Sequence, residues 1–125
     1  MKILIVEDNP TDLKLTEHVL CEAGHQVISV ELAEQSLTTI KRTKPDMILI
    51  DLNLPGMTGL KLAKILREDE ETMQVPIVAI SAYPERFSRG AVAAAGCIGY
   101  LAKPLNTRTL ADQLEAMAAK KPEER

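Results

Sequence analysis

Five short apolar segments recur along the chain, and a longer stretch of mixed polarity follows each of them. The apolar segments cover residues 2–6, 27–30, 47–51, 77–81 and 97–101. Uninterrupted apolar runs of this length are typical of strands that are buried on both faces, as in a parallel sheet. The second segment is more mixed in polarity, so we expect it to lie nearer an edge of the sheet.

The intervening stretches carry apolar residues at the three- and four-residue spacing of helices. Asn9 is a good N-cap, Pro10 a good first helical residue, and Gly24 a good left-handed end for the first helix. We expect Pro84 to begin a single fourth helix that runs to Gly96. The predicted helices cover about residues 10–23, 33–41 and 84–96, with a final helix around residues 110–117. A further helix is predicted to begin at about residue 60 and to end in the charged run of residues 67–71.

Regular alternation of strands and helices predicts an α/β fold with a parallel sheet, right-handed crossovers and helices on both faces. The three most apolar segments, residues 2–6, 47–51 and 77–81, should form the central strands. This arrangement indicates a flavodoxin-like, doubly wound sheet of five strands in the order 2-1-3-4-5.

A length of 125 residues predicts one domain, which we place at residues 1–119, followed by a charged C-terminal tail at 120–125. Aromatic residues make up only 2% of the chain and the net charge is -3, which disfavours binding to nucleic acid or anionic membranes. Two cysteines, no signal peptide and no apolar run of membrane-spanning length lead us to expect a cytoplasmic protein.

Polar residues gather where the predicted strands end. Glu7 and Asp8 end the first strand, Asp51 the third and Ser81 the fourth, while Lys103 follows the fifth. These ends should share one rim of the sheet, where three carboxylates repel one another unless a cation joins them. Oxygen ligands without His or Cys favour Mg²⁺ over zinc. An Asp beside a cation, a Lys and a hydroxyl is suited to forming an aspartyl phosphate.

The order and spacing of four short motifs resemble the receiver domain of two-component response regulators, from Met1 to about Ala119. The motifs are Val6-Glu7-Asp8-Asn9, Asp51-Leu52-Asn53-Leu54-Pro55-Gly56, Ala79-Ile80-Ser81-Ala82 and Tyr100-Leu101-Ala102-Lys103-Pro104. The resemblance implies a stand-alone, single-domain regulator in a phosphorelay.

The resemblance assigns a role to each acid at the rim. Asp51 would be the phosphoacceptor. Asp8, Asp51 and the backbone carbonyl of Asn53 would hold Mg²⁺, with Mn²⁺ as an alternative ion, and Glu7 would act through bound water. Glu7 is a common variant of the first acid in the family.

The same resemblance assigns the phosphoryl-binding and switch residues. Ser81, Ala82 and Lys103 would face the phosphoryl group, Tyr100 would be the aromatic switch, and the Lys103–Pro104 peptide bond would be cis. Serine in place of threonine at the switch position keeps the hydroxyl.

The family resemblance also implies partners. The phosphoryl group would come from a histidine kinase or a histidine phosphotransfer protein. A downstream protein would bind the face formed by the fourth helix, fifth strand and fifth helix, where Arg86, Arg89 and Arg108 offer contacts. We expect no nucleic acid or membrane partner, and a monomer or a weak phosphorylation-dependent dimer. The chain would not be an enzyme, beyond self-catalysed phosphorylation and dephosphorylation.

Three alternatives compete with this interpretation. One is a receiver domain excised from a hybrid histidine kinase. An aspartyl-phosphate phosphatase of the haloacid dehalogenase type needs a second Asp two residues after its nucleophile, where this chain has Asn53. A flavin or nucleotide binder needs small residues with free amides in its first loop, where this chain has Glu7 and Asp8.

The remaining candidate residues have simpler interpretations. We expect His18 on a helix surface and His25 in a turn, without metal ligation. Cys21 and Cys97 are expected to be small packing residues.

Overall fold

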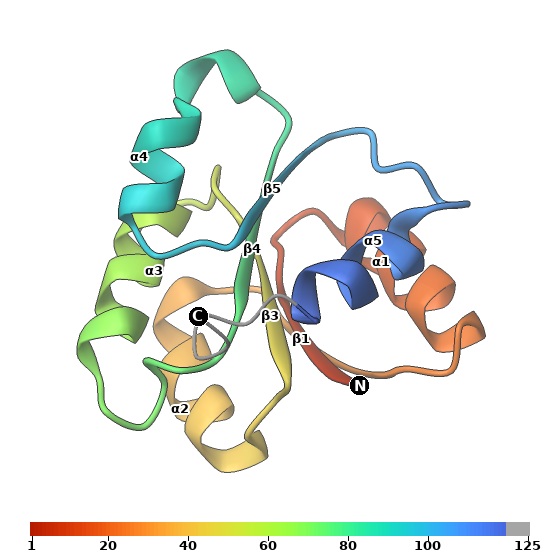
Figure 1. Ribbon diagram of the computed structural model, residues 1–125, viewed down its shortest axis with the longest axis horizontal. Helices are drawn as coiled ribbons and strands as arrows, with labels where there is room; N and C mark the ends of the chain where they lie inside the picture. Colours follow the sequence, from red (N-terminus) through yellow and green to blue (C-terminus); the bar gives the residue numbers. More distant parts are fainter. Residues whose placement is uncertain (120–125) are drawn as a thin grey trace.

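Five parallel strands form one sheet in the computed structural model, which describes residues 1–119 (Figure 1). The spatial order of the strands is β2-β1-β3-β4-β5, as predicted. The strands are β1 (Lys2–Val6), β2 (Gln26–Val30), β3 (Met47–Asp51), β4 (Ile77–Ser81) and β5 (Gly99–Ala102). The helices are α1 (Pro10–Glu22), α2 (Ala33–Thr43), α3 (Gly59–Glu68), the 3₁₀ turn η1 (Pro84–Arg86), α4 (Arg89–Ala94) and α5 (Leu110–Ala118).

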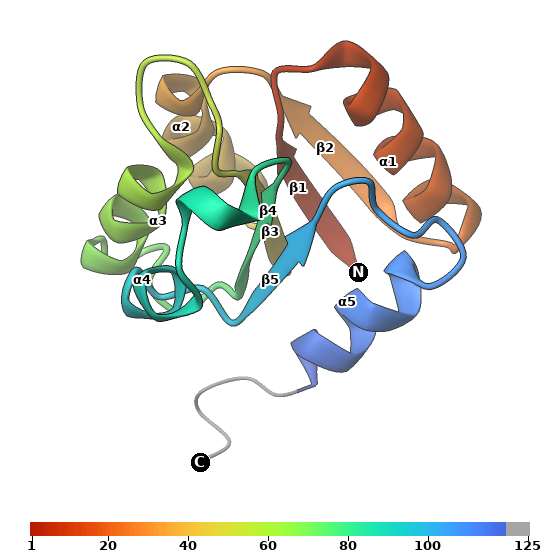
Figure 2. The ribbon, with the colours of Figure 1, turned by 90° about the horizontal axis from the view of Figure 1, so that it is seen from above.

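Helices cover both faces of the sheet: α1 and α5 lie on one side, and α2, α3 and α4 on the other (Figure 2). Successive strand residues point to opposite faces, so alternate residues feed two cores. The α1/α5 core is built from Ile3, Ile5, Leu13, Leu20, Met47, Leu49, Val78, Ile80, Leu110 and Leu114. The opposite core includes Leu4, Val6, Ile40, Ile48, Ile50, Leu62, Leu66 and Ile77.

Burial of the strands follows their place in the sheet. Every residue of β3 and β4 is buried, whereas β2 at the edge has two exposed and two half-buried residues before the buried Val30. The predicted central position of the most apolar segments is therefore confirmed. Within residues 1–119, none of the helices is long and apolar enough to cross a bilayer.

The prediction of a single fourth helix is wrong. The chain forms η1 and then breaks at Phe87, whose backbone is extended at φ −132° and ψ 110°. Ser88 then caps a separate α4, accepting a hydrogen bond from the amide of Ala91. Phe87 packs against a small third core of Leu52, Ala79 and Val92, and this packing accounts for the break in the chain before α4 begins.

Helix α3 ends at Glu68, within the charged run of residues 67–71 where the sequence predicts its end, and just beyond it the Thr72 hydroxyl donates to the carbonyl of Leu66 at 2.6 Å. One strand start differs from the prediction. Strand β5 begins at Gly99, two residues later than expected. The predicted charged tail, residues 120–125, lies outside the described residues.

Candidate functional site

The carboxyl ends of four strands meet at one rim of the sheet. Val6 pairs with Ile50, so Glu7 lies level with Asp51 at the end of the neighbouring strand. Ser81 pairs with Ala102, so Lys103 follows directly at the end of the next strand. The register of the parallel strands therefore brings together polar residues that are far apart in the sequence.

Three acids converge at this rim. One carboxylate oxygen from each of Glu7, Asp8 and Asp51 lies within 4.8 Å of the others. Glu7 and Asp51 are only 5% and 4% exposed, whereas Asp8 faces solvent. Hard oxygen donors with one open side are the donor set that Mg²⁺ prefers, since this ion keeps several waters. The residues present therefore fit a magnesium ion.

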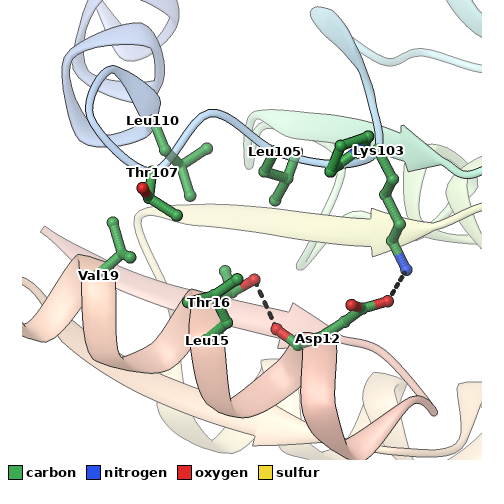
Figure 3. A pocket seen from close by; sticks show the side chains of 9 residues that line it. Asp12, Leu15, Thr16, Val19, Lys103, Leu105, Thr107 and Leu110 are labelled. Carbon is green, nitrogen blue, oxygen red and sulfur yellow. Dashed lines mark hydrogen bonds and ion pairs between the residues drawn. The ribbon is translucent and has the colours of Figure 1, made fainter.

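The Lys103 ammonium forms ion pairs with two of these acids and with a further acid, Asp12. Its Nζ atom lies 2.6 Å from Glu7 Oε1, 3.0 Å from Asp51 Oδ2 and 2.9 Å from Asp12 Oδ2. Asp12 lies in the first turn of α1 and is not among the predicted site residues (Figure 3). A signal was present, because Asp12 precedes the buried Thr16 by one helical turn and so lies on the inward side of the helix.

Crowding of charge separates the pKa values of the two buried acids. Burial and the neighbouring Asp51 carboxylate raise the pKa of Glu7 to about 7, against the opposing effect of Lys103. Burial also acts to raise the pKa of Asp51, but hydrogen bonding with Glu7, the Asn53 amide and Lys103 outweighs it, and the pKa lies below its ordinary value. Of the two buried acids, Asp51 is therefore the one that favours the ionised form.

A chain of hydrogen bonds leads from Asp51 to the end of β4. The amide of Asn53 donates to Asp51 Oδ1 at 2.8 Å, and the Ser81 hydroxyl donates to Asn53 Oδ1 at 3.0 Å. The amide of Tyr83 in turn donates to Ser81 Oγ at 2.9 Å. Ala82 lies between these last two residues with its side chain exposed. The acidic rim is thus connected to the loop that precedes η1.

Glycine is needed beside Asp51 at the start of α3. A Cβ on Gly59 would lie 2.6 Å from the Asp51 carbonyl and 2.7 Å from the Leu52 Cα atom. Helix α3 therefore begins in direct contact with the end of β3, which fixes the loop that carries Asn53.

Tyr100 lies on β5, beside η1 and α4. Its hydroxyl donates to the Pro84 carbonyl at 3.3 Å, and its ring packs against the small core that contains Leu52 and Val92. With Phe87 it lines a surface hollow of about 210 Å³. Tyr100 is half-buried.

Two expectations outside the rim are wrong. His25 is not a simple turn residue: its Nδ1 lies 2.9 Å from the Met1 amine, and its Nε2 lies 2.8 Å from a carboxylate oxygen of Glu115 on α5. Cys21 is exposed, because it follows the buried Leu20 onto the outer side of α1. Cys97 packs against two of the cores, as expected. The Lys103–Pro104 peptide bond is cis.

Comparisons with known proteins agree with this geometry. A family model described as the response regulator receiver domain matches residues 3–115. The polar-differentiation response regulator DivK of Brucella ovis is 31% identical over 104 residues, covering 83% of this chain and 85% of that protein.

Solved structures of response regulators and receiver domains are also similar to this chain. The receiver domain of a sensor histidine kinase of Pseudomonas aeruginosa, with a magnesium ion coordinated in its active-site cleft, is 32% identical with a TM-score of 0.86; the match covers 95% of this chain and 98% of that one. The chemotaxis response regulator CheY4 of Vibrio cholerae is 29% identical with a TM-score of 0.84, over 93% of this chain and 97% of that one.

The fold and the acidic rim define a signalling domain of two-component systems rather than a classical enzyme. The chain belongs to the response regulator receiver domain family. Receiver domains bind Mg²⁺ at an acidic pocket, and they interact with histidine kinases or phosphotransfer proteins and with downstream targets.

Proposed function

We propose that this chain accepts a phosphoryl group on Asp51 from a histidine kinase or a histidine phosphotransfer protein, and that its output is contact with another protein. The observation that carries the proposal is the ionised Asp51 carboxylate, 4% exposed at the rim, with the Lys103 ammonium 3.0 Å away and two further acids beside it. An anionic phosphoryl group can approach such a carboxylate only where positive charge offsets the repulsion.

Asp8, Asp51 and the backbone carbonyl of Asn53 would hold Mg²⁺ or Mn²⁺, with Glu7 acting through water. When bound, the cation neutralises charge on the acids and on the incoming phosphoryl oxygens. The grouping of Glu7, Asp8 and Asp51 oxygens within 4.8 Å supports this assignment.

The residues of the chain supply the other parts of the transfer. Asp51 attacks the phosphorus of the donor's phosphohistidine, so a P–O bond to Asp51 forms and the P–N bond breaks. The leaving imidazole nitrogen keeps the electron pair and takes a proton from solvent. The Asn53 amide orients Asp51 through the bond to Oδ1, and Lys103 donates to a phosphoryl oxygen.

Ser81 and Tyr100 would pass the signal to the surface. The Ser81 hydroxyl, which now donates to Asn53, would turn to a phosphoryl oxygen, and the half-buried ring of Tyr100 would move inward. The hollow beside Phe87 would then change shape, together with the surface around α4, β5 and α5 that carries Arg89 and Arg108. A phosphoryl group biases these two arrangements only by its differential affinity for them.

A receiver domain that belongs to a hybrid kinase is the second candidate. It is supported by the 32% identity to the receiver of a sensor histidine kinase, which is close to the 31% identity to a DivK-type regulator. Both candidates share the same chemistry at Asp51.

The test is incubation with acetyl phosphate and Mg²⁺, followed by intact-protein mass measurement. We expect a single phosphoryl group on the wild type and on Asp112→Asn, which removes an exposed acid of α5 that is not part of the acidic cluster. Asp51→Asn, or the wild type in EDTA, should gain none. Equal labelling of Asp51→Asn and wild type would contradict the proposal.

A further inference from the structure

Asp12 is the exposed member of the three carboxylates that hold Lys103. Its side chain is 41% exposed, compared with 6% for Glu7 and 5% for Asp51, yet its Oδ2 lies 2.9 Å from Lys103 Nζ. The contact joins the first turn of α1 to the segment after β5, across 91 residues of sequence. Figure 3 shows the two side chains pointing toward each other from these two elements.

Both ends of this ion pair are held by their backbones. The amide of Asp12 donates to the Asn9 cap at 3.0 Å, and its carbonyl accepts from the buried Thr16 hydroxyl at 2.8 Å. The amide of Lys103 donates to the Ser81 carbonyl at 2.9 Å. The ion pair therefore links two residues whose backbones are held in place by hydrogen bonds.

A lysine ammonium has three N–H donors, and here three carboxylates take them. Two of these acceptors, Glu7 and Asp51, also belong to the acidic cluster that fits Mg²⁺, whereas Asp12 does not. A cation at the cluster would draw on the oxygens of Glu7 and Asp51 and repel the ammonium. Among the three acceptors, Asp12 is the one whose bond to Lys103 does not compete with the cation.

We propose that Asp12 is a positioning residue, which keeps the Lys103 ammonium beside Asp51 when a divalent cation occupies the acidic cluster. The donors released from Glu7 and Asp51 are then free for phosphoryl oxygens, while the third stays on Asp12. This inference rests on the proposed function, because it concerns the Lys103 that would meet the phosphoryl group.

Asp12→Ala removes the anchor, Asp12→Glu restores a carboxylate, and Glu22→Ala removes an exposed acid at the other end of α1 as a matched control. The first readout is the side-chain ammonium signal of Lys103 in ¹H–¹⁵N spectra of the full chain at saturating Mg²⁺, assigned by its absence in Lys103→Arg. We expect a resolved signal in wild type, Asp12→Glu and Glu22→Ala, and its loss by fast solvent exchange in Asp12→Ala.

The second readout is the rate of labelling by acetyl phosphate at saturating Mg²⁺. We expect the labelling rate of Asp12→Ala to be about tenfold lower than that of Glu22→Ala. This is the lower end of the effect typical of residues that orient the direct ligands of a site. The melting temperature of Asp12→Ala should change little, because Asp12 is 41% exposed and an ion pair with a solvent-exposed partner adds little stability.

Retention of the Lys103 signal in Asp12→Ala, or a labelling rate equal to that of Glu22→Ala, would overturn the role of Asp12. Failure of the wild type to accept any phosphoryl group would instead overturn the proposed function. In that case the ammonium signal would still decide whether Asp12 holds Lys103.

Discussion

The Ser81 hydroxyl donates a hydrogen bond to the side-chain oxygen of Asn53 at 3.0 Å, joining the end of β4 to the loop after β3. Asn53 in turn holds the Asp51 carboxylate through its amide. The hydroxyl that would follow the phosphoryl group is therefore already in contact with the residue whose amide holds Asp51.

Ser81→Ala should separate phosphorylation from its transmission. The buried hydroxyl makes two hydrogen bonds, so its loss should cost about 1–3 kcal/mol of unfolding free energy while Asp51 remains reactive. Tyr100→Ala should accept phosphate equally well. We expect both variants to lose the gain in affinity for a downstream partner that phosphorylation gives the wild type, measured by calorimetry. A full gain in both variants would mean that the signal leaves by another face.

Glu7 should make stability depend on pH in the metal-free protein. Its pKa is raised from 4.5 to about 7 on folding, first of all by burial. The folded state therefore binds more protons than the unfolded state between these two values, and stability falls as pH rises through that window. We expect a fall on the order of 2 kcal/mol between pH 4.5 and 7 in EDTA, measured by urea unfolding.

Glu7→Gln should flatten this dependence, because the amide cannot ionise. Glu68→Gln, which changes an exposed acid on α3, should leave it unchanged. An equal slope in wild type and Glu7→Gln would show that another group titrates.

Magnesium should stabilise the wild type by binding the folded state. At a concentration about a hundredfold above the dissociation constant, the gain is about 2.7 kcal/mol, and EDTA should abolish it. Asp8→Asn removes the exposed acid of the cluster, so its melting temperature should respond much less to Mg²⁺. Asp112→Asn is the control and should respond as the wild type does. Identical responses of both variants would place the cation elsewhere.

The strand order was predictable because the apolar runs of β1, β3 and β4 are long enough to require burial on both faces. The break at Phe87 was not, since Pro84 is a good helix start and the inward turn depends on packing against Leu52, which local sequence does not encode.

The same distinction applies to the site. The carboxyl ends of the strands share one rim in any parallel sheet. The convergence of Glu7, Asp51 and Lys103 could therefore be predicted from the sequence. The partners of Asp12 and His25 lie 91 and 90 residues away on other elements, so their contacts depend on how α1 and α5 dock. Such contacts depend on tertiary packing, and no sequence motif predicts them.

Mapping the modified residue is the most direct test of the central claim. After incubation with acetyl phosphate and Mg²⁺, borohydride reduction converts an aspartyl phosphate to homoserine, and tandem mass spectrometry of the digested chain then locates it. The account predicts homoserine at position 51 in the wild type, in proportion to the phosphoryl group incorporated, and none in EDTA. Homoserine at position 8, or at position 12 with Asp51 unmodified, would contradict it.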